Sequence, residues 1–219
     1  MKKKTVIITA GGIGKRMESN LPKQFLLLQG KTILQHCIEK FFNYDQNIQI
    51  ILTLPEDWKD FWGKLCKTNS FTIPHTIVSG GVERYDSIKN ALHISHGDLI
   101  AIHDGVRPLV STKLISEGFD LAQEMGTAIP LVSVKESIRF VEKDQNKSLD
   151  RTHYFTVQTP QIFSKEIIRK AYEIPFHQAI TDDASLVEES GVELSLFTGE
   201  EQNIKITTPL DLKIAELLM

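Results

Sequence analysis

The sequence IITAGGIGKRMESNLPKQ, residues 7–24, decides the fold. It continues an apolar run that begins at residue 5 and is typical of a strand buried in a parallel sheet. Gly11, Gly12 and Gly14 then allow a tight turn in which backbone N–H groups can approach a ligand closely. An ordinary turn between a strand and a helix would use the same glycines, so the glycines alone favour neither interpretation.

Three cations, Lys15, Arg16 and Lys23, lie beside this turn in the sequence. An Arg side chain offers paired hydrogen bonds to phosphate, so the cations favour a loop that binds a polyanion. A P-loop is excluded because Arg16 stands where Gly-Lys should be followed by Ser or Thr. A dinucleotide-binding fingerprint is excluded because Met17 stands where a small residue is needed. We therefore predict a phosphate-binding loop of another kind.

The composition limits the possible partners. The chain has 219 residues and is 41% hydrophobic, enough for the core of one large α/β domain. Lys and Arg number 25 and Asp and Glu number 28, giving a net charge of −3. This balance predicts no nucleic-acid-binding or membrane surface, so an anion site must be local.

The two cysteines, Cys37 and Cys66, lack the paired spacing of a disulfide framework or a zinc site. Buried thiols in a reducing compartment are the better interpretation, and we expect a cytoplasmic protein. The apolar run near the N-terminus is too short for a signal peptide and breaks at glycines.

Strand-like and helix-like segments alternate along the chain, which predicts an α/β fold with a mostly parallel sheet covered by helices on both faces. The simplest organisation is a single domain over residues 1–219. Ser164 and Thr181 are expected to cap two helices, and Pro209 to open the last one. Strands are expected at residues 5–8, 48–53, 76–78, 99–103, 128–134, 193–197 and 204–207, and helices at residues 33–42, 58–67, 85–94, 114–125, 165–172, 182–190 and from 209 onward.

Residues 136–158 break this alternation. Polar residues crowd into positions 142–150 around a turn signal at Asp144, with short alternating runs on each side. The pattern predicts a hairpin or arm that leaves the main body. A hairpin with a thin apolar face is marginal alone and would need a partner's surface, although a loosely attached surface hairpin is the alternative.

Candidate catalytic residues follow the expected strand at residues 99–103, at the edge where open α/β sheets bind ligands. Asp104 could hold a Mg²⁺ ion that bridges phosphates, or could equally be a turn or cap residue. His103 could act as a base, but a packed, hydrogen-bonded histidine is the better interpretation. Arg107 would suit a second anionic ligand or a surface ion pair.

Several sequence blocks occur in an order that resembles the 2-C-methyl-D-erythritol 4-phosphate cytidylyltransferases, nucleotidyltransferases of the non-mevalonate isoprenoid pathway. The resemblance runs nearly end to end, and the ordered set is far more specific than any one block. Thr9 and Gly11 stand where the family more often has Pro and Ala, but these changes leave the charged positions intact. The blocks are AGGIGKRM, LPKQF, GGVERYDSI, HDGVRP in place of the commoner HDAARP, LDRTHYFTVQTPQIF, TDDAS and NIKITTPLDL.

The resemblance implies a Rossmann-like nucleotidyltransferase domain that binds CTP and Mg²⁺. Arg16 and Lys23 match the cations that bind the triphosphate and steady its charge during displacement. Asp104 matches the Mg²⁺ ligand. The implied nucleotide-binding residues are Ala10, Gly11, Gly12 and Gly14 in the first glycine turn, Gly81, Val82 and Ser87 around cytosine and ribose, and Arg84 near them.

The resemblance also implies a homodimer. Arg107, Thr181 and Lys205 match residues that hold the methylerythritol phosphate. Ser137 and Arg151 fall in the predicted arm, which in the family reaches into the neighbouring subunit's site. Residues 136–158 are therefore expected to be a dimerisation arm exchanged between subunits.

The implied reaction transfers CMP from CTP to 2-C-methyl-D-erythritol 4-phosphate, with pyrophosphate leaving. No covalent nucleophile is needed, because the substrate phosphate is itself a nucleophilic anion. The same blocks also resemble those of ribitol-5-phosphate cytidylyltransferase. The TDDAS block with Ser185 favours the methylerythritol enzyme. A non-catalytic nucleotide-binding module is a further alternative, which the presence of Arg16, Lys23 and Asp104 disfavours.

Overall fold

Hydrophobic strands form the centre of the protein, and the computed structural model describes residues 2–12 and 21–219. Strands β1 (Lys4–Thr9), β4 (Gln49–Leu54), β5 (Thr76–Ser79) and β6 (Leu99–Asp104) run parallel, in the order β6-β1-β4-β5. Every residue of β6 is buried, as expected for a parallel strand covered on both faces. The register pairs Thr9 with Asp104, so the first glycine turn and Asp104 leave the same edge of the sheet.

The other half of the sheet is partly antiparallel. Strand β11 (Gln161–Ser164) lies between β6 and β7 (Thr127–Ser133) and runs antiparallel to both. Strand β10 (Phe155–Val157) pairs antiparallel with β7, and β12 (Leu196–Thr198) pairs parallel with it. The expected α/β fold with a mostly parallel sheet is confirmed, but β11 had no counterpart among the predicted strands.

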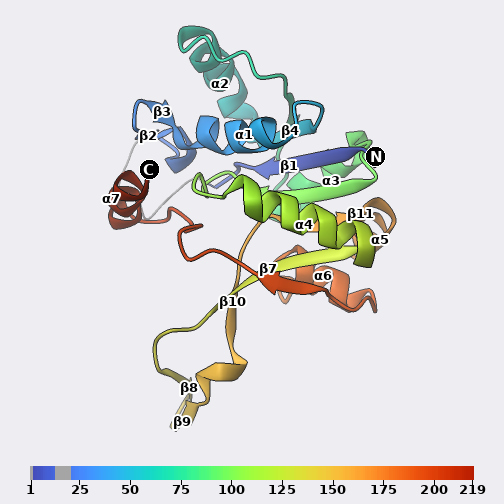
Figure 1. Cartoon of the computed structure of the whole chain (residues 1–219), viewed down its shortest axis with the longest axis vertical. Coiled ribbons are helices and arrows are strands. Elements are labelled where there is room, and N and C mark those ends of the chain that lie inside the picture. The colour runs from blue at the N-terminus through green and yellow to red at the C-terminus, as the bar shows by residue number, and fades with distance from the viewer. Residues whose placement is uncertain (1, 13–20) are drawn as a thin grey trace.

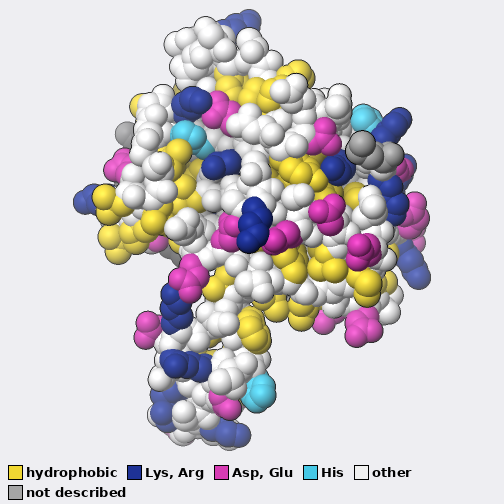
Figure 2. All heavy atoms as spheres, in the orientation of Figure 1, with side chains coloured by type: hydrophobic (Ala, Val, Ile, Leu, Met, Phe, Trp, Pro, Cys, Tyr) yellow, Lys and Arg dark blue, Asp and Glu magenta, His cyan; other side chains and the backbone are white. Residues whose placement is uncertain are grey.

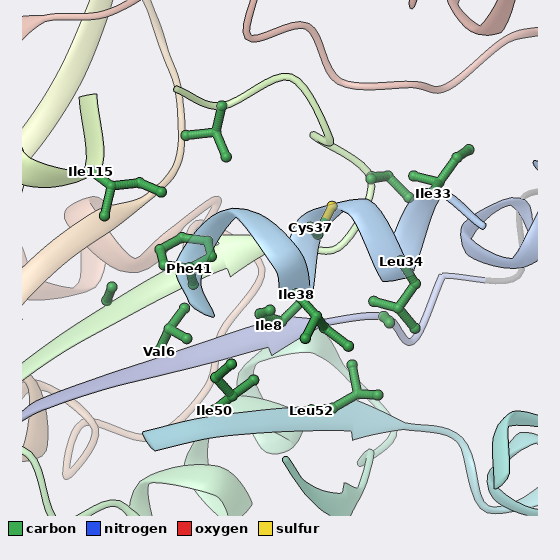
Figure 3. Close-up of a cluster of buried hydrophobic side chains, with 14 of the residues drawn as sticks. Val6, Ile8, Ile33, Leu34, Cys37, Ile38, Phe41, Ile50, Leu52 and Ile115 are labelled. Carbon is green, nitrogen blue, oxygen red and sulfur yellow. The ribbon is translucent and has the colours of Figure 1, made fainter. Parts of the chain in front are cut away.

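Helices cover both faces of the sheet (Figure 1). On one face, Ile8 of β1 packs in a cluster with Phe41 and Ile115, which come from α1 and α4 (Figure 3). On the other face, the adjacent Ile7 packs with Ile88 of α3 and with residues of α5 and α6. The pleat of β1 therefore sends neighbouring side chains into two separate cores. The helices are α1 (Ile33–Tyr44), α2 (Glu56–Thr68), α3 (Arg84–Ile94), α4 (Thr112–Met125), α5 (Lys165–Ala171), α6 (Asp183–Glu189) and α7 (Pro209–Leu218).

Several short elements complete the fold. A tight hairpin joins β2 (Leu27–Leu28) to β3 (Lys31–Thr32), with positive φ angles at its two turn residues, Gln29 and Gly30. Single turns of 3-10 helix occur at Lys23–Phe25 and Arg151–His153. Within the described residues, no helix combines the length and apolar character that crossing a membrane requires.

Three local expectations were wrong. Thr181 does not cap α6, because the Asp182 side chain accepts the Ser185 N–H at 2.9 Å and occupies the cap position. Residues 204–207 form no strand: Ile206 is fully buried, and its N–H donates to the Val106 carbonyl at 2.9 Å, so the apolar alternation reflects burial. The strand expected at 193–197 begins only at Leu196.

The predicted hairpin is present and projects from the main body (Figure 1). Strands β8 (Ile138–Glu142) and β9 (Gln145–Leu149) pair with each other, and no other described strand pairs with them. The stretch predicted as an arm, residues 136–158, also contains β10, which returns to the main sheet. We call residues 136–151, which contain β8, β9 and their turn, the arm.

Candidate active site

A cavity of about 260 Å³ opens at the carboxyl ends of β1, β4 and β6. This edge is where open α/β sheets place their ligands. The cavity brings together predicted residues that lie as far apart in the sequence as Ala10 and Lys205. Small and apolar ones are Ala10, Gly11, Gly12, Gly81, Val82 and Ser87, and charged ones are Lys23, Arg84, Asp104 and Lys205.

The first glycine turn enters the cavity directly after β1. A side-chain carbon added to Gly11 would meet no atom of the described residues within 4 Å, so this position leaves open space on the side that they face. Gln24 is buried, and its Nε2 donates to the Ala10 carbonyl at 2.7 Å, which ties the Lys23–Phe25 turn to the loop. Gly14 and Arg16, which the sequence also assigns to this loop, lie outside the described residues.

A second turn, after β5, forms the opposite wall. The Gly81 N–H donates to Ser87 Oγ at 2.9 Å, and the same hydroxyl donates to the Glu83 carbonyl at 3.1 Å. A side-chain carbon at Gly81 would lie 2.1 Å from Asp86 Cβ, so only glycine fits there. Val82 is 95% exposed at the rim. The Ser87 hydroxyl therefore holds the turn in shape as well as lining the cavity.

Asp104 forms the charged centre of the site. Its Oδ2 contacts Lys205 Nζ at 3.0 Å and Arg107 Nε at 3.2 Å, and Arg84 Nε lies 3.9 Å from its Oδ1. Burial alone would raise the pKa of this carboxyl, but Arg84, Lys205 and Arg107 outweigh burial and hold the pKa well below its usual range. Asp104 is therefore a fixed negative charge within a cluster of cations.

Arg107 lies behind Asp104, outside the cavity. Its side chain is 11% exposed, and its second hydrogen bond is donated to the Asn203 carbonyl at 2.8 Å. These contacts hold Asp104 and the turn that precedes Lys205. The structure thus gives Arg107 a supporting position, and its contact with substrate remains a prediction.

His103 is a packed histidine, as the sequence favoured, and does not face the cavity. Its ring packs edge-to-face against Phe41, and its Nε2 hydrogen-bonds the Arg107 carbonyl at 3.1 Å. Its Nδ1 lies 3.2 Å from Thr159 Oγ1, which accepts the Asp104 backbone N–H. Burial lowers the pKa of His103 to about 4, so the ring is neutral near pH 7.

The remaining predicted residues lie apart from this cavity. Thr181 is exposed and lines a smaller cavity next to Arg84. Ser137 and Arg151 are exposed at the base of the arm, where Arg151 donates to the Lys135 carbonyl. Among the described residues that line the main cavity, none belongs to the arm. The described part of the chain therefore assembles the predicted nucleotide-binding and metal-binding residues that it contains, but does not bring Ser137 and Arg151 to them.

Asp183, which was not among the residues predicted from the sequence, holds Arg84 in place. Arg84 donates to Asp183 Oδ2 at 2.7 Å, and the Tyr172 hydroxyl donates to Oδ1 at 2.6 Å. Asp183 is almost completely buried, at 1% exposure. The acidic pair of the TDDAS block was a signal for this role, but only the structure shows that Asp183 faces inward while Asp182 caps the helix.

The described residues contain no cluster of three or more His, Cys, Asp or Glu side chains that could enclose a metal ion. Of the described residues that line the cavity, Glu83 and Asp104 carry carboxylates, and Asp104 is the one that contacts Lys205 and Arg107. Mg²⁺ is commonly held by one or two carboxylates and completed by substrate phosphates and water. The donor set therefore fits a Mg²⁺ ion that binds together with a nucleotide.

Comparisons with known proteins agree with this geometry. The family model for 2-C-methyl-D-erythritol 4-phosphate cytidylyltransferase matches residues 4–219. Relatives of that name from Azobacteroides pseudotrichonymphae and Bacteroides thetaiotaomicron are each 45% identical, over 100% and 99% of this chain and 100% of their own lengths.

Solved structures extend the likeness to three dimensions. The 4-diphosphocytidyl-2C-methyl-D-erythritol synthase of Anaerococcus prevotii superposes with a TM-score of 0.85 at 26% identity, covering 99% of this chain and 96% of that one. The 2-C-methyl-D-erythritol 4-phosphate cytidylyltransferase of Thermus thermophilus gives 0.80 at 27% identity, covering 99% and 98%. The match to the family model and the full-length identities show that this chain belongs to the 2-C-methyl-D-erythritol 4-phosphate cytidylyltransferase family.

Proposed function

We propose that the cavity at the carboxyl ends of β1, β4 and β6 is where this cytidylyltransferase transfers CMP from CTP to 2-C-methyl-D-erythritol 4-phosphate. The reaction releases pyrophosphate and supplies the non-mevalonate route to isoprenoid precursors. The observation that carries this assignment is Asp104, buried at a strand end and surrounded by cations, between two glycine turns. A purely nucleotide-binding module would not need that charge arrangement.

The first glycine turn, after β1, is the proposed binding site of the triphosphate. No atom of the described residues lies within 4 Å of a side-chain carbon built at Gly11, and Lys23 lines the same cavity. Charge grows on the leaving pyrophosphate during displacement, so Lys23 would stabilise the transition state more than the ground state. Arg16 has the same proposed role on sequence grounds.

The second glycine turn, after β5, is the proposed binding site of cytidine. Gly81 can carry no side chain, and Ser87 fixes its N–H, so a flat ring can approach the backbone there. The backbone edge and the small Ser87 side chain suit a pyrimidine and leave little room for a purine. Val82 at the rim and Arg84 below it complete this wall.

Asp104 is the proposed Mg²⁺ ligand. Asp104 would hold the ion, which would supply positive charge against the negative charge that develops during transfer. Arg107 and the backbone bond to Thr159 keep the carboxylate oriented toward the cavity. The low pKa of Asp104 keeps it ionised and available as a ligand throughout the physiological range.

The phosphate of the second substrate is the proposed nucleophile, and cations must bring it to the α-phosphorus despite its negative charge. Lys205 is well placed for this, because its side chain is 44% exposed and its Nζ lies 3.0 Å from Asp104. Thr181 and Arg107 are the other proposed phosphate contacts. Positioning and charge neutralisation then account for the catalysis, without a covalent intermediate.

The arm of a second subunit is proposed to complete the active site of this chain. Its strand β8 exposes Phe140 and Val141, the latter at 68%, and the arm carries several Lys and Arg side chains (Figure 2). Such a hairpin needs a surface to pack on. We propose a homodimer in which Ser137 and Arg151 of one chain complete the phosphate site of the other.

The proposed location is the cytoplasm. Cys37 and Cys66 are both free thiols, which a reducing compartment preserves.

Pyrophosphate release tests the assignment. The protein should release pyrophosphate when CTP and 2-C-methyl-D-erythritol 4-phosphate are both present, and EDTA should stop the reaction. ATP in place of CTP is the control for the cytidine wall, and ribitol 5-phosphate is the control for the acceptor. Equal release with ribitol 5-phosphate would overturn the acceptor assignment, and EDTA-resistant release would overturn the metal.

A further inference from the structure

The two oxygens of the Asp104 carboxylate have unequal surroundings. Oδ2 is held by Lys205 at 3.0 Å and by Arg107 at 3.2 Å. Among the residues that the structure describes, the ion-pair contact of Oδ1 is with Arg84, whose Nε lies 3.9 Å away. That distance is too long for a hydrogen bond. Within the described part of the chain, Oδ1 is therefore the oxygen left open for a ligand.

Arg84 stays at this distance because another carboxylate holds it. The Arg84 guanidinium donates to Asp183 Oδ2 at 2.7 Å, and 34% of the Arg84 side chain is exposed. The Asp183 pair is short and charge-assisted, which makes it the stronger of the two contacts that Arg84 forms with carboxylates. Asp183 and Asp104 thus compete for one cation, and Asp183 holds it.

Tyr172 keeps Asp183 in the orientation that this contact requires. Its hydroxyl donates to Asp183 Oδ1 at 2.6 Å, so both oxygens of the buried carboxylate are engaged. Burial, and then the charge of Asp183, raise the pKa of Tyr172 well above its usual value, so the hydroxyl remains a donor. The ring of Tyr172 stacks on Tyr85, with centroids 4.8 Å apart, which fixes its direction.

We propose that Asp183, oriented by Tyr172, is a positioning residue that restrains Arg84 and so keeps Oδ1 of Asp104 free for the metal. The inference rests on the proposed function, since it takes Asp104 as the metal ligand. Arg84 has several donors on a planar fork, so when released it would close the short gap to Asp104 and form a direct pair. That pair would occupy the oxygen that the metal needs.

Direct measurement of metal binding tests this inference without relying on turnover. Mn²⁺ is titrated into the full-length protein with a non-hydrolysable CTP analogue and followed by electron paramagnetic resonance, with the analogue alone as reference. Asp183→Asn should weaken Mn²⁺ binding by about tenfold, within the range of couplings between contacting side chains. Tyr172→Phe should weaken it less. In kinetics, Asp183→Asn should raise the KM for Mg²⁺, and excess Mg²⁺ should restore most of kcat.

Two further variants separate restraint of Arg84 from general loss of structure. Asp182→Ala removes the cap of the same helix and its bond to Gln161. Asp182 forms no hydrogen bond or ion pair with Arg84, whose carboxylate partners among the described residues are Asp183 and Asp104. Asp182→Ala should lower the melting temperature and leave Mn²⁺ binding unchanged. In an Arg84→Gln background, Asp183→Asn should have no further effect on Mn²⁺ binding, because the cation it restrains is absent. An additive effect in that background would overturn the inference.

Asp104→Asn distinguishes failure of this inference from failure of the proposed function. If Asp104→Asn leaves Mn²⁺ binding intact, the metal assignment itself is wrong. If Asp104→Asn abolishes Mn²⁺ binding while Asp183→Asn leaves it at the wild-type value, Asp104 remains the ligand and the role of Asp183 is wrong. A crystal structure of Asp183→Asn gives a third readout, in which Arg84 should lie within hydrogen-bond distance of Asp104.

Discussion

The cavity and the arm both carry predicted site residues, but this chain fixes the cavity residues much more firmly. In the cavity, Asp104 has two short contacts to cations, and Arg84 is held by a buried carboxylate. On the arm, Ser137 and Arg151 are exposed, and the arm strands pair with each other. Groups that stabilise developing charge must be oriented before the reaction begins, and the cavity meets that requirement. The arm can meet it only with contacts from outside the chain.

The free-energy cost of holding charged side chains in place also differs between the cavity and the arm. Burying the charges of Asp104, Arg107 and Asp183 carries a desolvation penalty that their mutual attraction offsets only with good geometry. The exposed charges of the arm carry little such penalty, and they contribute little to folding. We therefore expect substitutions in the cavity to have large effects on catalysis within one chain, and substitutions on the arm to act through a second chain.

The largest expected effect is that of Asp104→Asn, which keeps the size of the side chain and removes its charge. Loss of a metal ligand should lower kcat by about 10³-fold and abolish the Mg²⁺ dependence. Steady-state kinetics over a Mg²⁺ series is the measurement. Asp144→Asn, the same change at the exposed turn of the arm, is the matched control and should leave kcat unchanged. A wild-type Mg²⁺ curve for Asp104→Asn would mean that Asp104 is only a structural residue.

Lys23→Ala should have the next largest effect. If Lys23 neutralises charge on the leaving pyrophosphate, its loss should lower kcat on the order of 10²-fold, as for other electrostatic stabilisers. Lys147→Ala removes an exposed Lys from β9 of the arm and serves as the control. Near-normal turnover of Lys23→Ala would contradict the triphosphate assignment and weaken the contrast between the regions.

The cavity was predictable in part because some of its signals are local. An apolar strand followed by Gly11 and Gly12, and another followed by Asp104, identify the edge of the sheet where ligands bind. The parallel register then brings these two strand ends together, as Thr9 pairs with Asp104. The position of the triphosphate and metal candidates followed from these short patterns.

Contacts over long sequence distances were not predictable. Arg84 and Asp183 are 99 positions apart, and no periodicity indicates that the second acid of TDDAS faces Arg84. Lys205 reaches Asp104 although residues 204–207 form no strand, because Ile206 anchors that segment in the core. Strand β11 reverses direction between β6 and β7, a choice that depends on the whole sheet. Local propensity does not determine such tertiary pairings.

Gly81→Ala tests whether backbone shape matters as much as charge in the cavity. The added carbon would lie 2.1 Å from Asp86 Cβ and 3.1 Å from the Asp86 carbonyl carbon, so the turn must move. Displacement of this cavity wall by about 1 Å should raise the KM for CTP by a factor on the order of tens. Gly63→Ala is the matched control, because that glycine lies in α2 with open space around it. Unchanged CTP binding by Gly81→Ala would place cytidine elsewhere.

The smallest expected effect is that of Arg151→Ala on the arm, which should act on one substrate only. Removal of a charged hydrogen bond to phosphate should raise the KM for the polyol phosphate roughly tenfold, while CTP binding changes little. Arg139→Ala, at another exposed Arg of the arm, is the control. An equal rise in the KM for CTP would contradict a specific contact with the second substrate.

Mixing mutant chains tests whether Arg151 acts on the partner's site, as the contrast between cavity and arm requires. Consider a heterodimer of one Arg151→Ala chain and one Asp104→Asn chain. If the arm is exchanged, both substitutions lie in one of its active sites and the other active site is intact. At substrate concentrations below KM, a random mixture should therefore recover about a quarter of wild-type activity, well above the mean of the two homodimers. If each chain completed its own site, every heterodimer would carry two damaged sites and the mixture would show only that mean. Heterodimer formation is verified by native mass spectrometry, so a mixture that contains heterodimers but shows no recovery would assign the arm to its own chain.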